Sequence, residues 1–128
     1  MSTYGFVKKV PLTVEDAEAR LREELGKQGF GVLVRIDLAE KLREKLGVAM
    51  EPYVILGACN PPNAHKAVAA EPDIGLLLPC NAVVYRRDGA TWVGVIRPTV
   101  AMQMVDNSAL AEIATAVERK LESAFKAV

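Results

Sequence analysis

The two cysteines are the side chains that could most readily do chemistry in this sequence. Cys59 ends an apolar run that predicts a buried strand, and it directly precedes a predicted helix whose partially positive start would favour a thiolate. Cys80 stands at the beginning of a predicted hairpin. Both are therefore candidate catalytic thiols, and burial as small apolar side chains is the alternative for each.

An asparagine follows each cysteine, in Cys59-Asn60 and in Cys80-Asn81. This repeated pair at two strand ends suggests that the two segments border one pocket. If the hairpin register continues far enough, Arg97 falls opposite Cys80, and a guanidinium there would favour the Cys80 thiolate. The predicted ligand-binding residues are Cys59, Asn60, Asn63, Cys80, Asn81 and Arg97.

Metal ions and large phosphates fit this region poorly. The only histidine is His65, and its spacing from Cys59 and Cys80 matches no zinc motif. We therefore predict no metal and no cofactor. Pro61 and Pro62 remove two backbone donors from the start of the predicted helix, which weakens a nucleotide-phosphate site there. Binding of a small ligand or of an anion remains open.

The elements that must position these residues follow from hydrophobic periodicity and capping signals. Strands are predicted at residues 4–10, 30–36, 53–59, 82–87 and 90–96, and helices at residues 13–25, 37–46, 60–70 and 108–125. Their order is β-α-β-α-β-α-β-β-α. We expect an α+β fold with a mixed sheet of about five strands and helices mainly on one face.

A hairpin between the last two strands is the clearest local signal. Asp88-Gly89 separates two β-prone runs, as in a type I′ turn, and this register pairs Tyr85 with Trp92. The pair predicts either sheet packing or a surface on which a ligand or partner could stack. Residues 98–105 are apolar and irregular, and we interpret them as a homodimer interface, with folding over the core as the alternative.

Composition limits the classes of partner. At 128 residues, of which 51% are hydrophobic, the chain fits a single domain spanning 1–128. Its 16 basic and 16 acidic residues cancel, so we expect no binding to nucleic acid or to an anionic membrane surface. The first five residues lack the basic and apolar runs of a secretory signal, and we expect a cytoplasmic protein.

Two segments carry a resemblance to a known family. The stretches at residues 55–61, ILGACNP, and at residues 77–81, LLPCN, resemble the bacterial and archaeal family catalogued as domain of unknown function 302. The resemblance extends from the first strand to about Met104. It implies a compact α+β domain and assigns no agreed activity. It also implies that both cysteine-asparagine segments belong to the family pattern.

Three functions remain open at this point. The first is a small-ligand or anion-binding module with a pocket between the Cys59 and Cys80 segments. The second is a thiol-redox or thiol-transfer enzyme that uses one or both cysteines, so whether the protein is an enzyme stays undecided. The third is a homodimeric protein that acts through an interaction surface.

Overall fold

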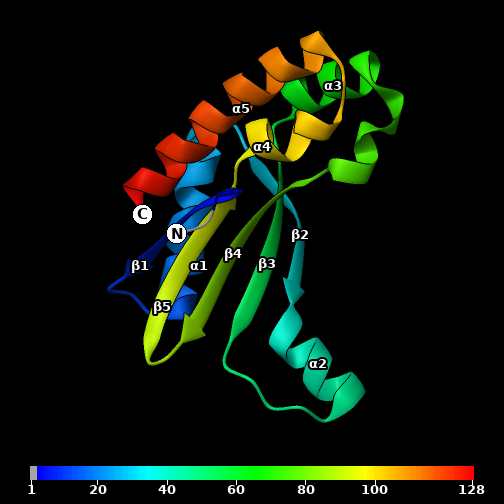
Figure 1. The fold of residues 1–128 in the computed structure, drawn as a ribbon. Coiled ribbons are helices and arrows are strands. Elements are labelled where there is room, and N and C mark those ends of the chain that lie inside the picture. Colours follow the sequence, from blue (N-terminus) through cyan, green and yellow to red (C-terminus); the bar gives the residue numbers. More distant parts are fainter. Residues whose placement is uncertain (1–2) are drawn as a thin grey trace.

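The computed structural model describes residues 3–128, so Met1 and Ser2 of the expected domain lie outside the described residues (Figure 1). The strands are β1 (Gly5–Val10), β2 (Gly31–Asp37), β3 (Tyr53–Cys59), β4 (Cys80–Arg87) and β5 (Ala90–Ile96). The helices are α1 (Val14–Lys27), α2 (Leu38–Leu46), α3 (Pro61–Ala70), α4 (Pro98–Ala101) and α5 (Ser108–Ala127), with short 3₁₀ turns η1 (Pro72–Leu77) and η2 (Met102–Met104).

The five strands form one sheet in the order β1-β5-β4-β3-β2. This confirms the α+β class, the number of strands and the element order. Every pairing is antiparallel, so the parallel pairs of the expected mixed sheet do not form among the described strands. The reason lies in the connections. Helix α2 extends beyond the end of β2 instead of crossing the sheet, so β3 returns beside β2 in the opposite direction (Figure 1).

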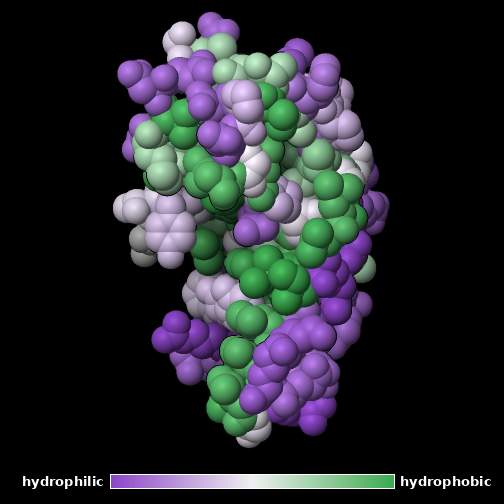
Figure 2. All heavy atoms as spheres, turned by 90° about the vertical axis from the view of Figure 1, so that its right-hand side faces the viewer, coloured by the Kyte–Doolittle hydropathy of each residue, from purple (hydrophilic) through white to green (hydrophobic). Residues whose placement is uncertain are grey.

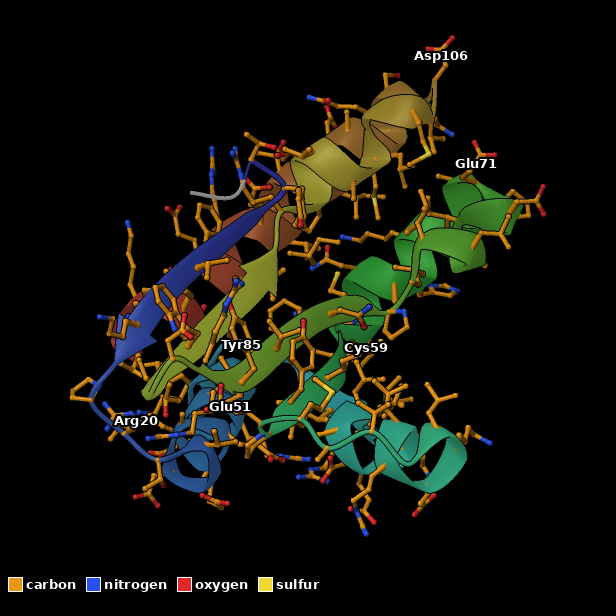
Figure 3. All side chains as sticks on the ribbon, turned by 60° about the horizontal axis from the view of Figure 1, so that its bottom comes forward. Arg20, Glu51, Cys59, Glu71, Tyr85 and Asp106 are labelled. Carbon is orange, nitrogen blue, oxygen red and sulfur yellow. The ribbon has the colours of Figure 1, made fainter. Side chains whose placement is uncertain are left out.

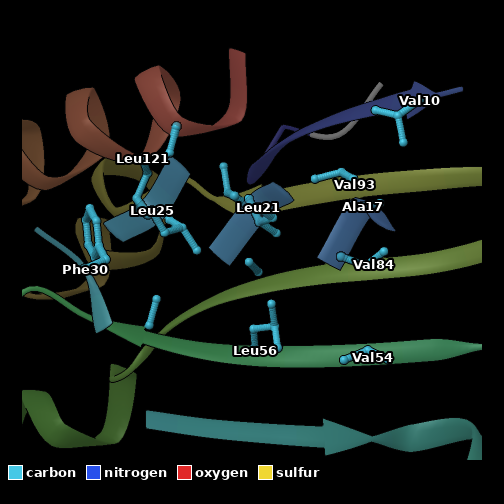
Figure 4. Packing of buried hydrophobic residues seen from close by; sticks show 14 of the residues in the cluster. Val10, Ala17, Leu21, Leu25, Phe30, Val54, Leu56, Val84, Val93 and Leu121 are labelled. Carbon is cyan, nitrogen blue, oxygen red and sulfur yellow. The ribbon is translucent and has the colours of Figure 1, made fainter. Parts of the chain in front are cut away.

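Helices α1 and α5 cover one face of the sheet, and the main core lies between them and the strands. Leu21 and Leu25 of α1 are fully buried against Leu56 of β3, Val84 of β4 and Leu121 of α5 (Figure 4). Along β3, alternate residues point to this core, and the residues between them point to the other face. None of the described helices packs across that second face of the sheet, which therefore stays open to solvent.

Local capping fixes the helix starts as the sequence predicts. Thr13 Oγ1 accepts a hydrogen bond of 3.1 Å from the backbone of Asp16, and Asp37 Oδ1 accepts one of 3.0 Å from the backbone of Glu40. The β4–β5 hairpin is also confirmed. Asp88 and Gly89 have φ angles of 52° and 77°, as a type I′ turn requires, and Tyr85 pairs with Trp92.

Candidate functional site

A cavity of about 310 Å³ lies at one end of the sheet, where β3 ends and β4 begins, between these strands and helices α3, α4 and α5. Apolar side chains form nearly all of its wall. The residues that line it are Phe30, Leu33, Val34, Ala58, Cys59, Asn60, Asn63, Ala64, Ala67, Leu78, Pro79, Cys80, Pro98, Met102, Ile113, Ala114 and Val117.

Small side chains explain why space remains in this part of the core. Ala64 and Ala67 face the cavity from α3, Ala114 faces it from α5 and Ala58 faces it from β3. Each alanine stops at Cβ, so these elements pack without filling the volume between them. Pro98 supports the opposite wall because it starts α4 and is buried.

The cavity reaches the surface on the side of strand β2. Leu33 and Val34, which line it, are exposed over 69% and 45% of their surface. Figure 2 shows this side of the molecule, with hydrophobic side chains gathered above the hydrophilic surface of α2. A ligand could therefore enter between apolar side chains without passing a charged group of the cavity wall.

Both thiols border the cavity, and both are free. Ala58 is the cross-strand partner of Cys80, and Cys59 directly follows Ala58 in the chain. The pairing of β3 with β4 therefore brings the two cysteines close together. Burial, and to a smaller extent the nearby Cys59, raise the pKa of the Cys80 thiol to about 11. Cys80 is consequently a neutral thiol at physiological pH.

Arg97 does not act on Cys80 as the hairpin register suggested. The pairing of β4 with β5 extends only to Ala82 opposite Val95. The Arg97 guanidinium instead donates to Glu118 Oε2 at 3.4 Å and lies 5.3 Å from the centre of the Phe6 ring. The expected stabilisation of a Cys80 thiolate is thus reversed, because burial dominates and no cation is near enough to offset it.

Asn60 and Asn63 supply the polar side chains of the cavity wall. Asn60 is only 7% exposed and caps α3, accepting hydrogen bonds from the backbone N–H of Asn63 at 3.4 Å and from its side-chain amide at 3.0 Å. The Asn60 amide donates to the Gln28 carbonyl at 3.3 Å. Its polar atoms are therefore used by the protein, and the remaining hydrogen-bonding capacity at the cavity belongs to Asn63.

The predicted ligand-binding residues divide between two places. Cys59, Asn60, Asn63 and Cys80 line the cavity. Asn81 is exposed and lies on the other face of the sheet, because successive residues of a strand point to opposite faces. Figure 3 shows Cys59 and Tyr85, which mark opposite ends of this part of the sheet.

Sequence reasoning missed the helical wall of the cavity. The helix predicted at residues 108–125 carries Ile113 and Val117, which line the cavity, but nothing in their spacing indicated a cavity beside them. Met102, expected at a dimer interface, lines the cavity, whereas Met104 is 76% exposed. The homodimer itself stays a prediction.

The described part of the chain places two further limits on the site. Within residues 3–128, no three His, Cys, Asp or Glu side chains gather closely enough to hold a metal ion. None of the helices described there has the length and apolar character needed to cross a membrane. The cavity wall carries no lysine or arginine, which removes support for an anionic ligand at this place.

Comparison with known proteins gives a consistent result. The family model described as "Domain of unknown function DUF302" matches residues 6–128. A crystal structure of an uncharacterized conserved protein DUF302 from Bacillus stearothermophilus is 35% identical, with a TM-score of 0.90 and 98% of each chain covered. The search of curated proteins finds no match.

Proposed function

Because this chain belongs to the DUF302 family, whose description names no activity, we propose from the geometry of the cavity that the protein binds a small apolar molecule there. The single observation that carries the proposal is a cavity of about 310 Å³ with a nearly uniform apolar wall. Ligand pockets typically begin near this volume and combine apolar walls with a few polar groups. Asn63 is the polar group that orients the ligand.

The absence of charge from the wall defines the class of ligand. Moving a carboxylate or phosphate into an apolar cavity without a counter-charge costs several kcal/mol. A neutral aliphatic or cyclic molecule with one hydroxyl or carbonyl group meets no such penalty. Its apolar part displaces water from the alanine and valine side chains, and its single polar atom bonds to the Asn63 amide.

Thiol chemistry is the second candidate, because Cys59 and Cys80 border the same cavity. A disulfide between them would require oxidation of both thiols by an external oxidant, with two electrons and two protons leaving the protein. The raised pKa of Cys80 argues against this thiol as the attacking nucleophile. Ligand binding is therefore the better supported of the two functions.

A titration with 1-octanol tests the proposal. We expect the methyl resonances of Ile113 and Val117, which line the cavity, to shift saturably in NMR spectra. The variant Ala64→Leu should abolish the shifts because its larger side chain fills the space. Ala69→Leu on the same helix is the matched control, since Ala69 is exposed and does not line the cavity.

Two results would contradict the proposal. One is the absence of any methyl shift up to the solubility limit of octanol. The other is a titration that Ala64→Leu leaves unchanged. Circular dichroism and thermal unfolding of both leucine variants establish whether each retains the native fold.

A further inference from the structure

The aromatic side chains are sorted between the two faces of the sheet according to their polarity. The three phenylalanines of the chain, Phe6, Phe30 and Phe125, all pack into the main core. The three tyrosines and the single tryptophan all line one hollow of about 480 Å³ on the open face. Tyrosine and tryptophan combine a broad apolar surface with a hydrogen-bonding group, and they are enriched where proteins bind other molecules.

A row of side chains across neighbouring strands forms one wall of the hollow. Tyr53 pairs with Tyr85, Tyr85 pairs with Trp92, and Trp92 pairs with Lys9. The rings of Tyr53 and Tyr85 are stacked, with centres 5.1 Å apart and planes inclined by 14°. Lys9 Nζ lies 5.8 Å from the centre of the Trp92 ring. The wall is thus aromatic and ends at a cation.

The next row along the strands forms the floor. Val83 lies opposite Gly94, and Gly94 lies opposite Val7. A Cβ atom at Gly94 would come within 3.1 Å of Val83 Cγ2 and 3.3 Å of Val7 Cγ2. Gly94 is buried and carries no side chain, so the two valines close over it and form an apolar floor at the foot of the aromatic wall.

We propose that this hollow binds a flat aromatic ring that carries a negatively charged group. The ring lies over Val7 and Val83 and contacts the Tyr85 and Trp92 rings, and its anionic group points toward Lys9. No aspartate or glutamate lines the hollow, so the anionic group meets Lys9 beside Trp92 and no carboxylate of the wall. The Asn81 amide at the rim can donate a hydrogen bond to a heteroatom of the ring.

The hollow favours a small molecule over a second copy of the chain. Sheets that pack face to face interdigitate side chains at close to crystalline density. A second sheet laid on this face would have to interdigitate with the aromatic row and place a carboxylate beside Lys9. A small ring needs only the space between the aromatic wall and the valine floor, and it supplies the negative charge itself.

The chain reports binding at this site through its only tryptophan. In a titration with 2-naphthoate, we expect the indole N–H cross-peak of Trp92 to shift saturably in a ¹H–¹⁵N spectrum. Cyclohexanecarboxylate, which has the charge but no flat ring, should bind about tenfold more weakly. Neutral 2-naphthalenemethanol should also bind more weakly, and added salt should reduce the difference between it and the acid.

Three variants separate the parts of the site. Tyr53→Leu removes one stacked ring and should weaken 2-naphthoate binding by about tenfold. Lys9→Gln changes an exposed residue and should weaken binding about threefold, with loss of the salt dependence. Ala64→Leu in the distant cavity should have no effect, so this test is independent of the octanol titration.

Several outcomes would overturn the inference. A Trp92 cross-peak that does not move at millimolar 2-naphthoate, or a titration unaffected by Tyr53→Leu, would show that the hollow does not select flat rings. A Trp92 shift that depends on protein concentration alone, with a dimer in sedimentation, would show that a second copy covers this face.

Discussion

The cavity at the end of the sheet and the hollow on its open face share strands β3 and β4, yet they take their walls from different sources. The cavity is enclosed by side chains from β2, β3, β4 and three helices, so segments far apart in the sequence meet around it. The hollow lies on neighbouring strands of the sheet, and their register alone sets its shape.

This difference has an energetic consequence. Residues around the cavity also hold the core together, so most substitutions there change the stability of the whole domain. Residues of the hollow face solvent on one side, and their replacement removes less buried surface. A substitution in the hollow can therefore change binding while the fold stays intact, and this makes the two regions separable by experiment.

The largest expected effect comes from two consecutive residues of β3 that point to opposite faces. Leu56 is fully buried against the helices, whereas Ile55 faces the open side and is only partly buried. We expect Leu56→Ala to lower the free energy of unfolding by about 3 kcal/mol. Ile55→Ala should lower it by about 1 kcal/mol. Urea unfolding followed by circular dichroism measures both values.

A covered open face would erase this contrast. If a second copy packed there in solution, Ile55 would be buried at the interface, and Ile55→Ala would cost nearly as much as Leu56→Ala. Its unfolding midpoint would also depend on protein concentration, because dissociation and unfolding would then be coupled. Repeating the unfolding at two concentrations that differ by about a hundredfold distinguishes the two cases.

Signals between residues that are close in sequence predicted most of the fold. The type I′ turn at Asp88-Gly89 and the helix caps at Thr13 and Asp37 depend on residues that are close in sequence, and all were predictable. The antiparallel pairing of β1 with β5 was not predictable, because more than half of the chain lies between these two strands. Their pairing depends on where α1 and α5 pack, which no local pattern encodes.

The candidate site was predictable only at its rim. The repeated cysteine-asparagine pairs drew attention to Cys59 and Cys80, which line the cavity. The space between them exists because α3 and α5 present alanines at the same place, and such a coincidence has no signature in a single sequence. Whether Asn60 and Asn81 lie at the cavity or on the open face likewise depends on the position of each residue relative to its strand.

The second prediction concerns the reactivity of Cys80. In the single-thiol variant Cys59→Ala, we expect the pH profile of alkylation by iodoacetamide to keep a raised midpoint, slightly below the native pKa of about 11, because burial is the larger of its two causes. The same thiol in urea should show the ordinary midpoint near 9.0. At pH 8 the folded protein should react roughly a hundredfold more slowly than the unfolded one.

The sign of this effect also sets the pH dependence of stability. The unfolded thiol ionises from about pH 9 and the folded thiol only near pH 11, so stability falls as pH rises through this window. Cys80→Ala should remove that part of the slope. An alkylation midpoint of the folded protein at or below that of the unfolded protein would contradict the burial of Cys80. It would also make a thiol enzyme the better supported function.

The smallest expected effect compares the two asparagines that follow the cysteines. Asn60 is buried at the cavity, where it caps α3 and donates to the Gln28 carbonyl at 3.3 Å. We expect Asn60→Ala to lower the free energy of unfolding by about 1.5 kcal/mol, since it removes the cap and leaves a carbonyl without its partner. Asn81 is exposed beside the hollow, and Asn81→Ala should change stability by less than about 0.5 kcal/mol.

Asn60→Ser resolves the two contributions of Asn60. Serine keeps an oxygen that can accept from the start of α3, but its shorter side chain has no amide to donate to the Gln28 carbonyl. Its unfolding free energy should therefore fall between those of the native protein and Asn60→Ala. Equal losses of unfolding free energy for Asn60→Ala and Asn81→Ala would contradict this prediction. They would mean that the buried asparagine stabilises the fold no more than the exposed one. The cavity wall would then not differ from the open face in its contribution to stability at these two residues, which stand in the same cysteine-asparagine pattern in the sequence.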